Sequence, residues 1–254
     1  MCLVTALFGI LIALAGQAPP DTCRQAAEAN RKGDYAEAES LLKVCLSEHP
    51  DDLTPYLWLC ALYQSQGRDD DLQAVALRGL EHFPDERRFY LTVGTHAGKA
   101  GQCDRAAEVL SEGFTRWPQD SALHDNLVQA LLCRGMNSLD EGDNESAASD
   151  LRRLLELDSD NLEALLNLGR ALHNLQRSGE ALQAFDRVFR LSPETPQIQF
   201  HRAAALSAMG RFEEAIESLN EEIRSQPDHA PSYYFRGVAY FYRGDWERAL
   251  SDLK

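Results

Sequence analysis

The sequence predicts an all-α fold, a solenoid of about seven helix-turn-helix repeats, and three regular spacings support this prediction. Glycines recur at intervals of 34 residues, and the interval resumes after one shift of seven residues. A proline follows most of these positions by 17 residues. Small residues form two columns, one seven residues before the glycine positions and one five residues after them, and only Leu72 interrupts the second column. The glycine register runs through Gly33, Gly67, Gly101, Gly135, Gly142, Gln176, Gly210 and Gly244.

Each spacing accounts for one part of a helical hairpin. Two columns of small residues on either side of a turn let two antiparallel helices approach closely. Apolar residues between the columns recur at helical spacing, as in YYFRGVAYFY at 233–242. The proline then ends the second helix. The small column of the first helices is Ala26, Cys60, Gly94, Gly135, Gly169, Ala203 and Gly237.

The same register sets the predicted boundaries of the repeats. The fourth repeat contains the extra seven residues, between Gly135 and Gly142, and seven residues are close to two helical turns. We therefore expect a lengthened first helix there, with DEGDNES at 140–146 as its exposed turn and the next cap. The predicted repeats lie near 19–52, 53–86, 87–120, 121–161, 162–195, 196–229 and 230–254, with the last one incomplete.

The pattern closely resembles the tetratricopeptide repeat, which places an aromatic residue, Leu-Gly, Tyr, Gly, Ala and Pro along 34 residues. The best copies are 164–193 and 232–253, and the resemblance covers about 19–254. It implies a right-handed superhelix whose first helices line a concave groove that binds a protein or an extended peptide. The groove positions that it implies include Asn126, Asn167, Arg170, His173, Asn174, Phe200, His201, Tyr234, Phe235, Phe241 and Tyr242.

The implied groove has an aromatic part and a polar part. Aromatic side chains anchor interfaces at low entropic cost, and asparagine side chains pair with the backbone of an extended ligand. Two alternatives stay open: the asparagines are merely solvated, or a C-terminal helix covers some of the aromatics. The chaperone-binding carboxylate clamp of the family is disfavoured, because only Arg88 has a suitable charge at the clamp positions of the first three repeats.

Two arginines depart from the family pattern. Arg202 and Arg236 occupy a usually apolar column of the first helix. We expect their stems to extend toward solvent or their guanidinium groups to meet acidic neighbours such as Glu214.

Composition and motifs narrow the function. The 40 acidic residues against 25 basic ones give a formal charge of −15, which disfavours nucleic acid and anionic membrane surfaces as partners. No sequence motif for metal binding, phosphate binding or nucleophilic catalysis occurs, so we expect a non-enzymatic scaffold without a cofactor or a metal. The alternatives are the substrate-presenting N-terminal part of a larger enzyme whose catalytic domain lies beyond Lys254, and self-association through the last repeat.

The N-terminal segment 1–18 is uncharged and apolar from Cys2 to Ala15, which is typical of a secretory signal peptide. We therefore expect an extracytoplasmic protein, periplasmic or secreted; the alternatives are an uncleaved anchor or a misplaced start codon, and without a signal the protein is cytoplasmic.

Removal of the segment leaves five cysteines, an odd number that argues against a disulfide framework. The family geometry brings Cys45 near Cys60, so a disulfide between these two is an alternative to buried thiols.

Overall fold

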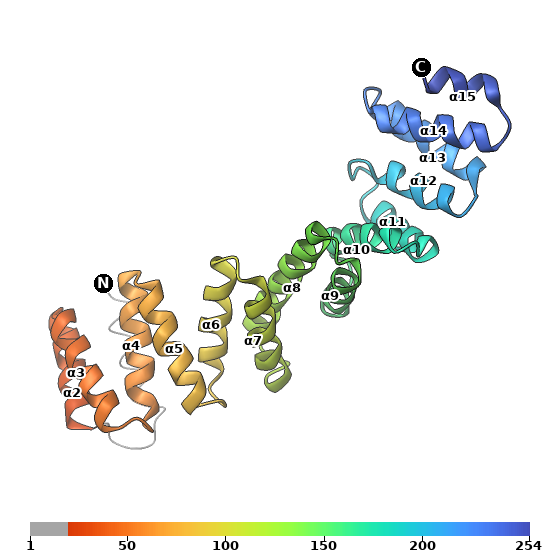
Figure 1. The fold of residues 1–254 in the computed structure, drawn as a ribbon. Coiled ribbons are helices and arrows are strands. Elements are labelled where there is room, and N and C mark those ends of the chain that lie inside the picture. The colour runs from red at the N-terminus through yellow and green to blue at the C-terminus, as the bar shows by residue number, and fades with distance from the viewer. Residues whose placement is uncertain (1–19) are drawn as a thin grey trace. The chain divides into compact units, whose positions relative to one another are not determined.

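The computed structural model describes residues 20–254, and the predicted signal segment 1–18 lies outside this part. The described chain is all-helical and contains no strand (Figure 1), so the predicted fold class is confirmed. The helices are α2 (Asp21–Lys32), α3 (Tyr35–Glu48), α4 (Leu53–Gln66), α5 (Asp69–His82), α6 (Arg87–Lys99), α7 (Cys103–Arg116), α8 (Ser121–Glu141), α9 (Asn144–Leu157), α10 (Leu162–Asn174), α11 (Ser178–Leu191), α12 (Ile198–Ala208), α13 (Phe212–Ser225), α14 (Ala230–Tyr242) and α15 (Trp246–Asp252).

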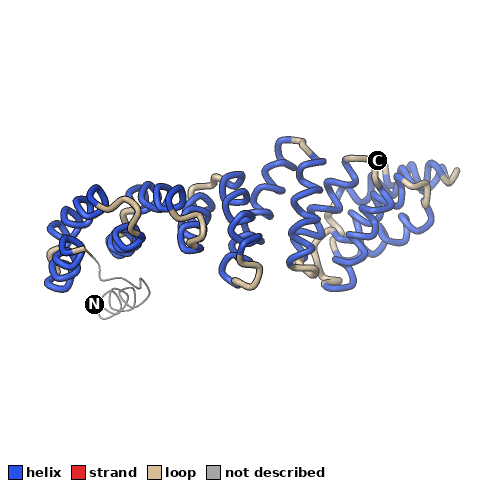
Figure 2. Tube along the Cα trace, turned by 90° about the horizontal axis from the view of Figure 1, so that it is seen from below, coloured by secondary structure: helices blue, strands red, loops and turns tan. Residues whose placement is uncertain are grey.

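The chain forms two compact units, Met1–Ala130 and Leu131–Lys254, and their boundary falls within α8. Within each unit, helices that follow one another in sequence pack against each other, from α2 to α7 in one and from α9 to α15 in the other. Short loops join them (Figure 2). This nearest-neighbour packing is typical of repeat solenoids, in which no single hairpin buries its apolar face alone.

Close helix crossings explain the column of small residues in the first helices. A Cβ atom built on Gly94 of α6 would lie 2.4 Å from Cγ of Leu110 on α7. The same construction on Gly169 of α10 would place Cβ 2.4 Å from Cε1 of Phe185 on α11. Both distances are shorter than carbon atoms tolerate, so only glycine allows these two helix pairs to approach so closely.

The turns follow from the glycine register. Gly33 ends α2 with φ of 83°, and its backbone N–H donates to the carbonyl oxygen of Asn30. This left-handed conformation is open to glycine at little cost, whereas a side chain is strained there. Gln176 occupies the same register position with φ of 60°, so one repeat keeps the conformation without glycine.

The lengthened fourth repeat is present. Helix α8 has 21 residues, whereas the other described helices have 14 or fewer. Gly142 follows it with φ of 83°, and the Asp143 carboxylate caps α9 by accepting from the backbone N–H of Ser146 at 3.1 Å. The expected turn and cap within DEGDNES are therefore confirmed.

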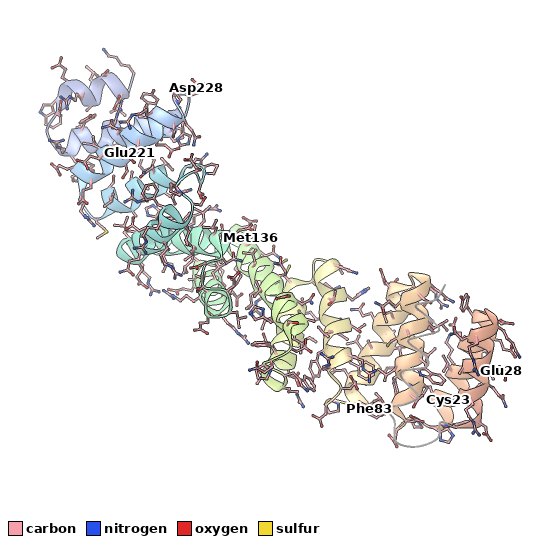
Figure 3. The ribbon with its side chains drawn as sticks, turned by 180° about the vertical axis from the view of Figure 1, so that it is seen from behind. Cys23, Glu28, Phe83, Met136, Glu221 and Asp228 are labelled. Carbon is pink, nitrogen blue, oxygen red and sulfur yellow. A yellow bond between two sulfur atoms is a disulfide. The ribbon has the colours of Figure 1, made fainter. Side chains whose placement is uncertain are left out.

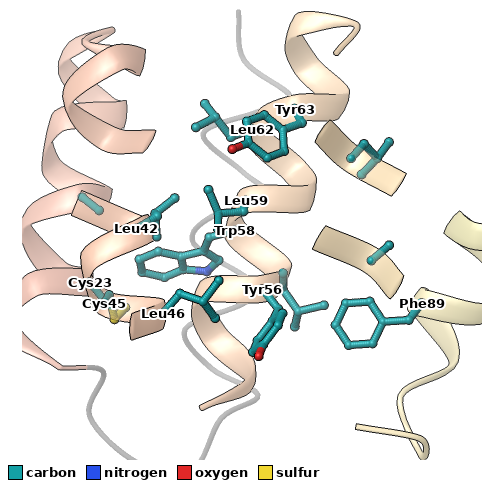
Figure 4. Packing of buried hydrophobic residues seen from close by; sticks show 14 of the residues in the cluster. Cys23, Leu42, Cys45, Leu46, Tyr56, Trp58, Leu59, Leu62, Tyr63 and Phe89 are labelled. Carbon is teal, nitrogen blue, oxygen red and sulfur yellow. A yellow bond between two sulfur atoms is a disulfide. The ribbon is translucent and has the colours of Figure 1, made fainter. Parts of the chain in front are cut away.

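The first repeats have a dense aromatic and aliphatic core (Figure 4). Trp58, Tyr56 and Tyr63 of α4 are almost completely buried against α3, α5 and Phe89 of α6. The hydroxyl group of Tyr63 remains satisfied because it donates to the Glu39 carboxylate at 3.0 Å.

The cysteine predictions were wrong in this region. Cys23 of α2 and Cys45 of α3 form a disulfide with an S–S distance of 2.05 Å, and Cys23 is marked in Figure 3. Cys60, the other partner considered for Cys45, is a free thiol. The pairing follows from the hairpin itself, because antiparallel α2 and α3 bring two residues that are 22 positions apart to a Cα–Cα distance of 5.7 Å.

The guanidinium groups of the two unusual arginines both meet acidic side chains, as expected. Nε and Nη2 of Arg236 both donate to the Asp252 carboxylate at 2.7 Å. Arg202 donates to Asp186 of the preceding repeat at 2.7 Å, so its acidic neighbour is Asp186 and not Glu214, the example named above. Glu214 instead accepts from Arg211 in the adjacent turn.

Among the helices of residues 20–254, none is both long and apolar enough to cross a membrane.

Candidate functional site

A pocket of about 230 Å³ lies among the first helices of consecutive repeats, α10, α12 and α14, in the second unit. The sequence places small and aromatic residues in these helices, and the close α10–α11 crossing at Gly169 brings the Phe185 ring of α11 up to the same space. Six of the predicted groove residues line the pocket together with Phe185 and Ala204. These six are Arg170, His173, Asn174, Phe200, His201 and Phe235.

Aromatic rings form most of the pocket wall. Phe200 lies edge-on to Phe235, with ring centroids 5.1 Å apart and planes at 81°. It meets His229 in the same way at 5.1 Å. The imidazole of His201 stacks on Phe185 at 5.3 Å and 19°. Such contacts between rings on α11, α12 and α14 hold the wall in a defined geometry.

The polar side of the pocket is formed by α10. Nη1 of Arg170 donates to Oδ1 of Asn167 at 3.0 Å, and Asn167 is itself buried. Asn174 donates through Nδ2 to Oδ1 of Asn144 on α9 at 2.9 Å. Arg170 is exposed and has no carboxylate within salt-bridge distance among the described residues. The pocket therefore has one guanidinium group that forms no ion pair with any side chain of residues 20–254.

The two imidazoles in the wall are neutral near neutral pH. Burial lowers the pKa of His201 to about 4, and the nearby Arg170 charge acts in the same direction. Burial also lowers the pKa of His173. The buried Nδ1 atom of His173 has no hydrogen-bond partner among residues 20–254. Because a neutral imidazole is less costly to desolvate than a charged one, an apolar group can pack against these two rings, and the buried Nδ1 of His173 stays available for a hydrogen bond.

The remaining predicted aromatic residues lie beside the pocket or apart from it. Tyr234 is 58% exposed and contacts Phe235 at a ring distance of 5.7 Å. Phe241 and Tyr242, at the end of α14, contact Trp246 and Phe212 respectively, with ring distances of 4.9 and 5.1 Å. The predicted aromatic wall thus consists of two groups of rings.

Asn126 belongs to the first unit. Its Nδ2 donates to the carbonyl oxygen of Ala122 at 2.7 Å, and its Oδ1 accepts from the hydroxyl of Thr95 at 3.2 Å. Both polar atoms therefore already have partners inside the protein.

The sequence reasoning did not identify Phe185 and Ala204 as pocket residues. Phe185 lies on the second helix α11, and the resemblance implies groove positions on first helices only, whereas Ala204 lies on the first helix α12. The signal was present nevertheless: Gly169 requires a close partner on the following helix, and Phe185 is the large residue that meets it.

A second pocket of about 190 Å³ lies among α4, α5 and α6 of the first unit. Its lining includes Gln64, Thr92, Thr95, His96 and Lys99 and contains no Phe, Tyr or Trp. Among the described residues, no group of three or more His, Cys, Asp or Glu side chains could hold a metal ion. The pocket of the second unit is therefore the better candidate for binding another molecule through an apolar anchor.

Two family models, both described as tetratricopeptide repeat, match the chain at residues 29–92 and at residues 134–196 and 200–253. Among solved structures, one described as "Crystal structure of MamA protein" is 23% identical, with a TM-score of 0.54 over 66% of this chain and 87% of that one. A MamA structure from Desulfovibrio magneticus RS-1 is 17% identical, with a TM-score of 0.53 over 66% of this chain and 92% of that one. A comparison with curated protein sequences gives no significant match. The helix pairs and the matches of both family models show that the chain belongs to the tetratricopeptide repeat family.

Proposed function

We propose that this protein is an exported, non-enzymatic scaffold that binds another protein as an extended segment through the pocket formed by α10, α12 and α14. One observation carries the proposal: aromatic rings from successive repeats converge on a single open pocket beside an exposed arginine without an acidic partner. Interface anchors are typically aromatic side chains and arginine, so this arrangement has the composition of a binding site for a protein.

The position of the pocket favours an extended ligand. Its wall is formed by three first helices in succession, and Tyr234 continues the aromatic surface beyond Phe235. A segment that follows these helices meets polar side chains on α10 and then aromatic rings on α12 and α14. The charge of −15 further favours a partner that is a protein over a nucleic acid.

The disulfide supports the proposed export. Disulfides persist mainly in oxidising compartments outside the cytosol, and Cys23–Cys45 lies in the first hairpin after the predicted signal segment. Sequencing the N-terminus of the protein recovered from the cell exterior or periplasm tests this part. We expect a start within a few residues of Gly16, and recovery only from the cytosol would contradict it.

An affinity experiment tests the binding function. The mature chain and a Phe200→Ala, Phe235→Ala double variant are immobilised and exposed to proteins from the source cells, with Tyr35→Ala as the control for removal of an exposed ring on α3. We expect the wild type and the control to recover the same partner and the pocket variant to lose it. Equal recovery by the pocket variant would exclude this pocket as the binding site.

A further inference from the structure

We infer that the pocket recognises one bulky apolar side chain together with an adjacent Asp or Glu side chain within an internal segment of the partner. This inference rests on the proposed function and adds the chemistry of the ligand. It is based on three features of the pocket: its volume, its unneutralised charge and its orientation of hydrogen-bond donors.

The volume fits a single large side chain. The pocket has about 230 Å³, whereas an apolar cavity of roughly 150 Å³ already accommodates benzene. Phe185, Phe200 and Phe235 supply ring faces and edges for such a group. An aromatic or branched aliphatic side chain can therefore enter without displacing the wall.

The charge of the lining favours an anion. No carboxylate lines the pocket, although the chain has 40 acidic residues, and His201 stays neutral because its pKa is about 4. Arg170 is the charged group of the lining, and no carboxylate of the described residues lies within salt-bridge distance of it. A ligand carboxylate would supply the opposite charge next to an apolar wall, where water screens the pair less than on an open surface.

The donors of Arg170 favour a carboxylate. Because Nη1 is already used by Asn167, the guanidinium edge formed by Nε and Nη2 is left for a ligand. Two parallel N–H groups on one edge match the two oxygens of a carboxylate in a bidentate pair. Buried Asn167 fixes the guanidinium, so the pair forms with little further ordering of the side chain.

The carboxylate belongs to an internal Asp or Glu because the binding surface continues on both sides of the pocket. Asn174 lies on the α9 side, where it bonds Asn144, and exposed Tyr234 lies beyond Phe235 on the α14 side. The terminus of a ligand chain would contact only one side of this surface, whereas an internal segment can contact the α9 side and the α14 side at once.

Capped dipeptides test this chemistry directly. We use acetyl-Phe-Asp-amide, its neutral analogue acetyl-Phe-Asn-amide, and acetyl-Asn-Phe with a free C-terminal carboxylate, each titrated into the full-length mature chain. Binding is followed through the NMR signals of the His173 and His201 rings. Ligands of this size bind in the millimolar range, and we expect the Phe-Asp peptide to bind about fivefold more tightly than either of the others.

Matched variants identify the residue responsible. The Arg170→Gln variant should bind the Phe-Asp and Phe-Asn peptides equally, because the pocket still binds their Phe ring. The control is Arg153→Gln, which changes an exposed arginine on α9 outside the pocket and should keep the fivefold preference. Equal binding of the Phe-Asp and Phe-Asn peptides to the wild type would overturn the inference, and so would an unchanged preference in Arg170→Gln. Tighter binding of acetyl-Asn-Phe, the peptide with a free C-terminal carboxylate, would contradict the inference that the carboxylate belongs to an internal Asp or Glu.

These outcomes are separable from those of the proposed function. If the affinity experiment recovers a partner that depends on Phe200 and Phe235 but the dipeptides show no acidic preference, only the ligand chemistry is wrong. If the pocket variant retains the partner, the proposed function fails whatever the dipeptides show.

Discussion

Gly169 of α10 and Phe185 of α11 are in such close contact that a methyl group on the glycine would overlap the ring: its Cβ would lie 2.4 Å from Cε1. The same ring stacks on His201 and lines the candidate pocket. One small residue in the repeat pattern therefore determines both the helix crossing and the position of a pocket wall.

Replacement of this glycine should damage the second unit. We expect Gly169→Ala to lower the free energy of unfolding by about 1–3 kcal/mol, because the buried ring must shift or the helices must separate. The matched control is Gly179→Ala on α11, where the nearest atom to the new Cβ is 4.0 Å away. That variant should gain about 0.5–1 kcal/mol from improved helix propensity, and both changes are measurable by urea unfolding. Equal stability of the two variants would contradict the proposed crossing.

The disulfide should stabilise the first hairpin. Its two cysteines are 22 positions apart, so its removal by Cys23→Ala and Cys45→Ala releases a closed loop in the unfolded chain, at a cost of about 3 kcal/mol. Hydrogen exchange should then show loss of protection in α2 and α3. Cys60→Ala removes a free thiol and should cost about 1 kcal/mol. Unchanged protection of α2 after loss of both half-cystines would contradict the stabilising role.

The Arg236–Asp252 pair should hold α15 against α14. Side-chain exposures of 17% and 9% make it one of the least exposed ion pairs described, and Asn220 accepts a third hydrogen bond from Arg236 at 2.7 Å. We expect Asp252→Asn to cost about 1–3 kcal/mol, because the half-buried guanidinium loses its counter-charge. The exposed Arg177–Glu180 pair is the control, and Glu180→Gln should leave the stability almost unchanged because water screens this pair. Similar losses in both variants, measured as exchange rates in α15 and α11, would argue against this role.

The pocket should become less stable in mild acid. Burial lowers the pKa of His201 to about 4 from an ordinary value of 6.5, so the folded state disfavours its protonated form. The contribution of neutral His201 to the free energy of unfolding is therefore complete above pH 6.5 and is lost as the pH falls toward 4. Between pH 7 and 5 we expect a decrease of about 1–2 kcal/mol in the wild type that is absent in His201→Gln. An NMR titration that shows His201 titrating near its ordinary value would contradict this prediction.

Most of the fold could be predicted from the sequence because every repeat adds the same evidence. The glycine register gave the turn at Gly33 and the extended α8 before Gly142, since a shift of two helical turns preserves the buried face. Gln176 shows the limit of that pattern: the turn keeps its left-handed conformation even where glycine is absent.

The candidate site could be predicted only in part. Positions such as Arg170 and Phe200 follow from the repeat register, but the register cannot show that Phe235 and His229 turn their rings toward Phe200. Side-chain rotamers decide these contacts, and they depend on packing between repeats. The disulfide was missed for a similar reason, because its formation depends on the crossing of α2 and α3 and not on the number of cysteines.

Site-specific photo-crosslinking tests the location of partner binding most directly. A benzophenone amino acid is placed at Tyr234, which is exposed and contacts the Phe235 ring of the pocket, or at Tyr35, which is exposed on α3 of the first unit. With proteins from the source cells, we expect the probe at Tyr234 to crosslink one partner through an internal peptide, identified by mass spectrometry, and the probe at Tyr35 to give none. A partner that crosslinks at Tyr35 and not at Tyr234 would contradict binding at this pocket.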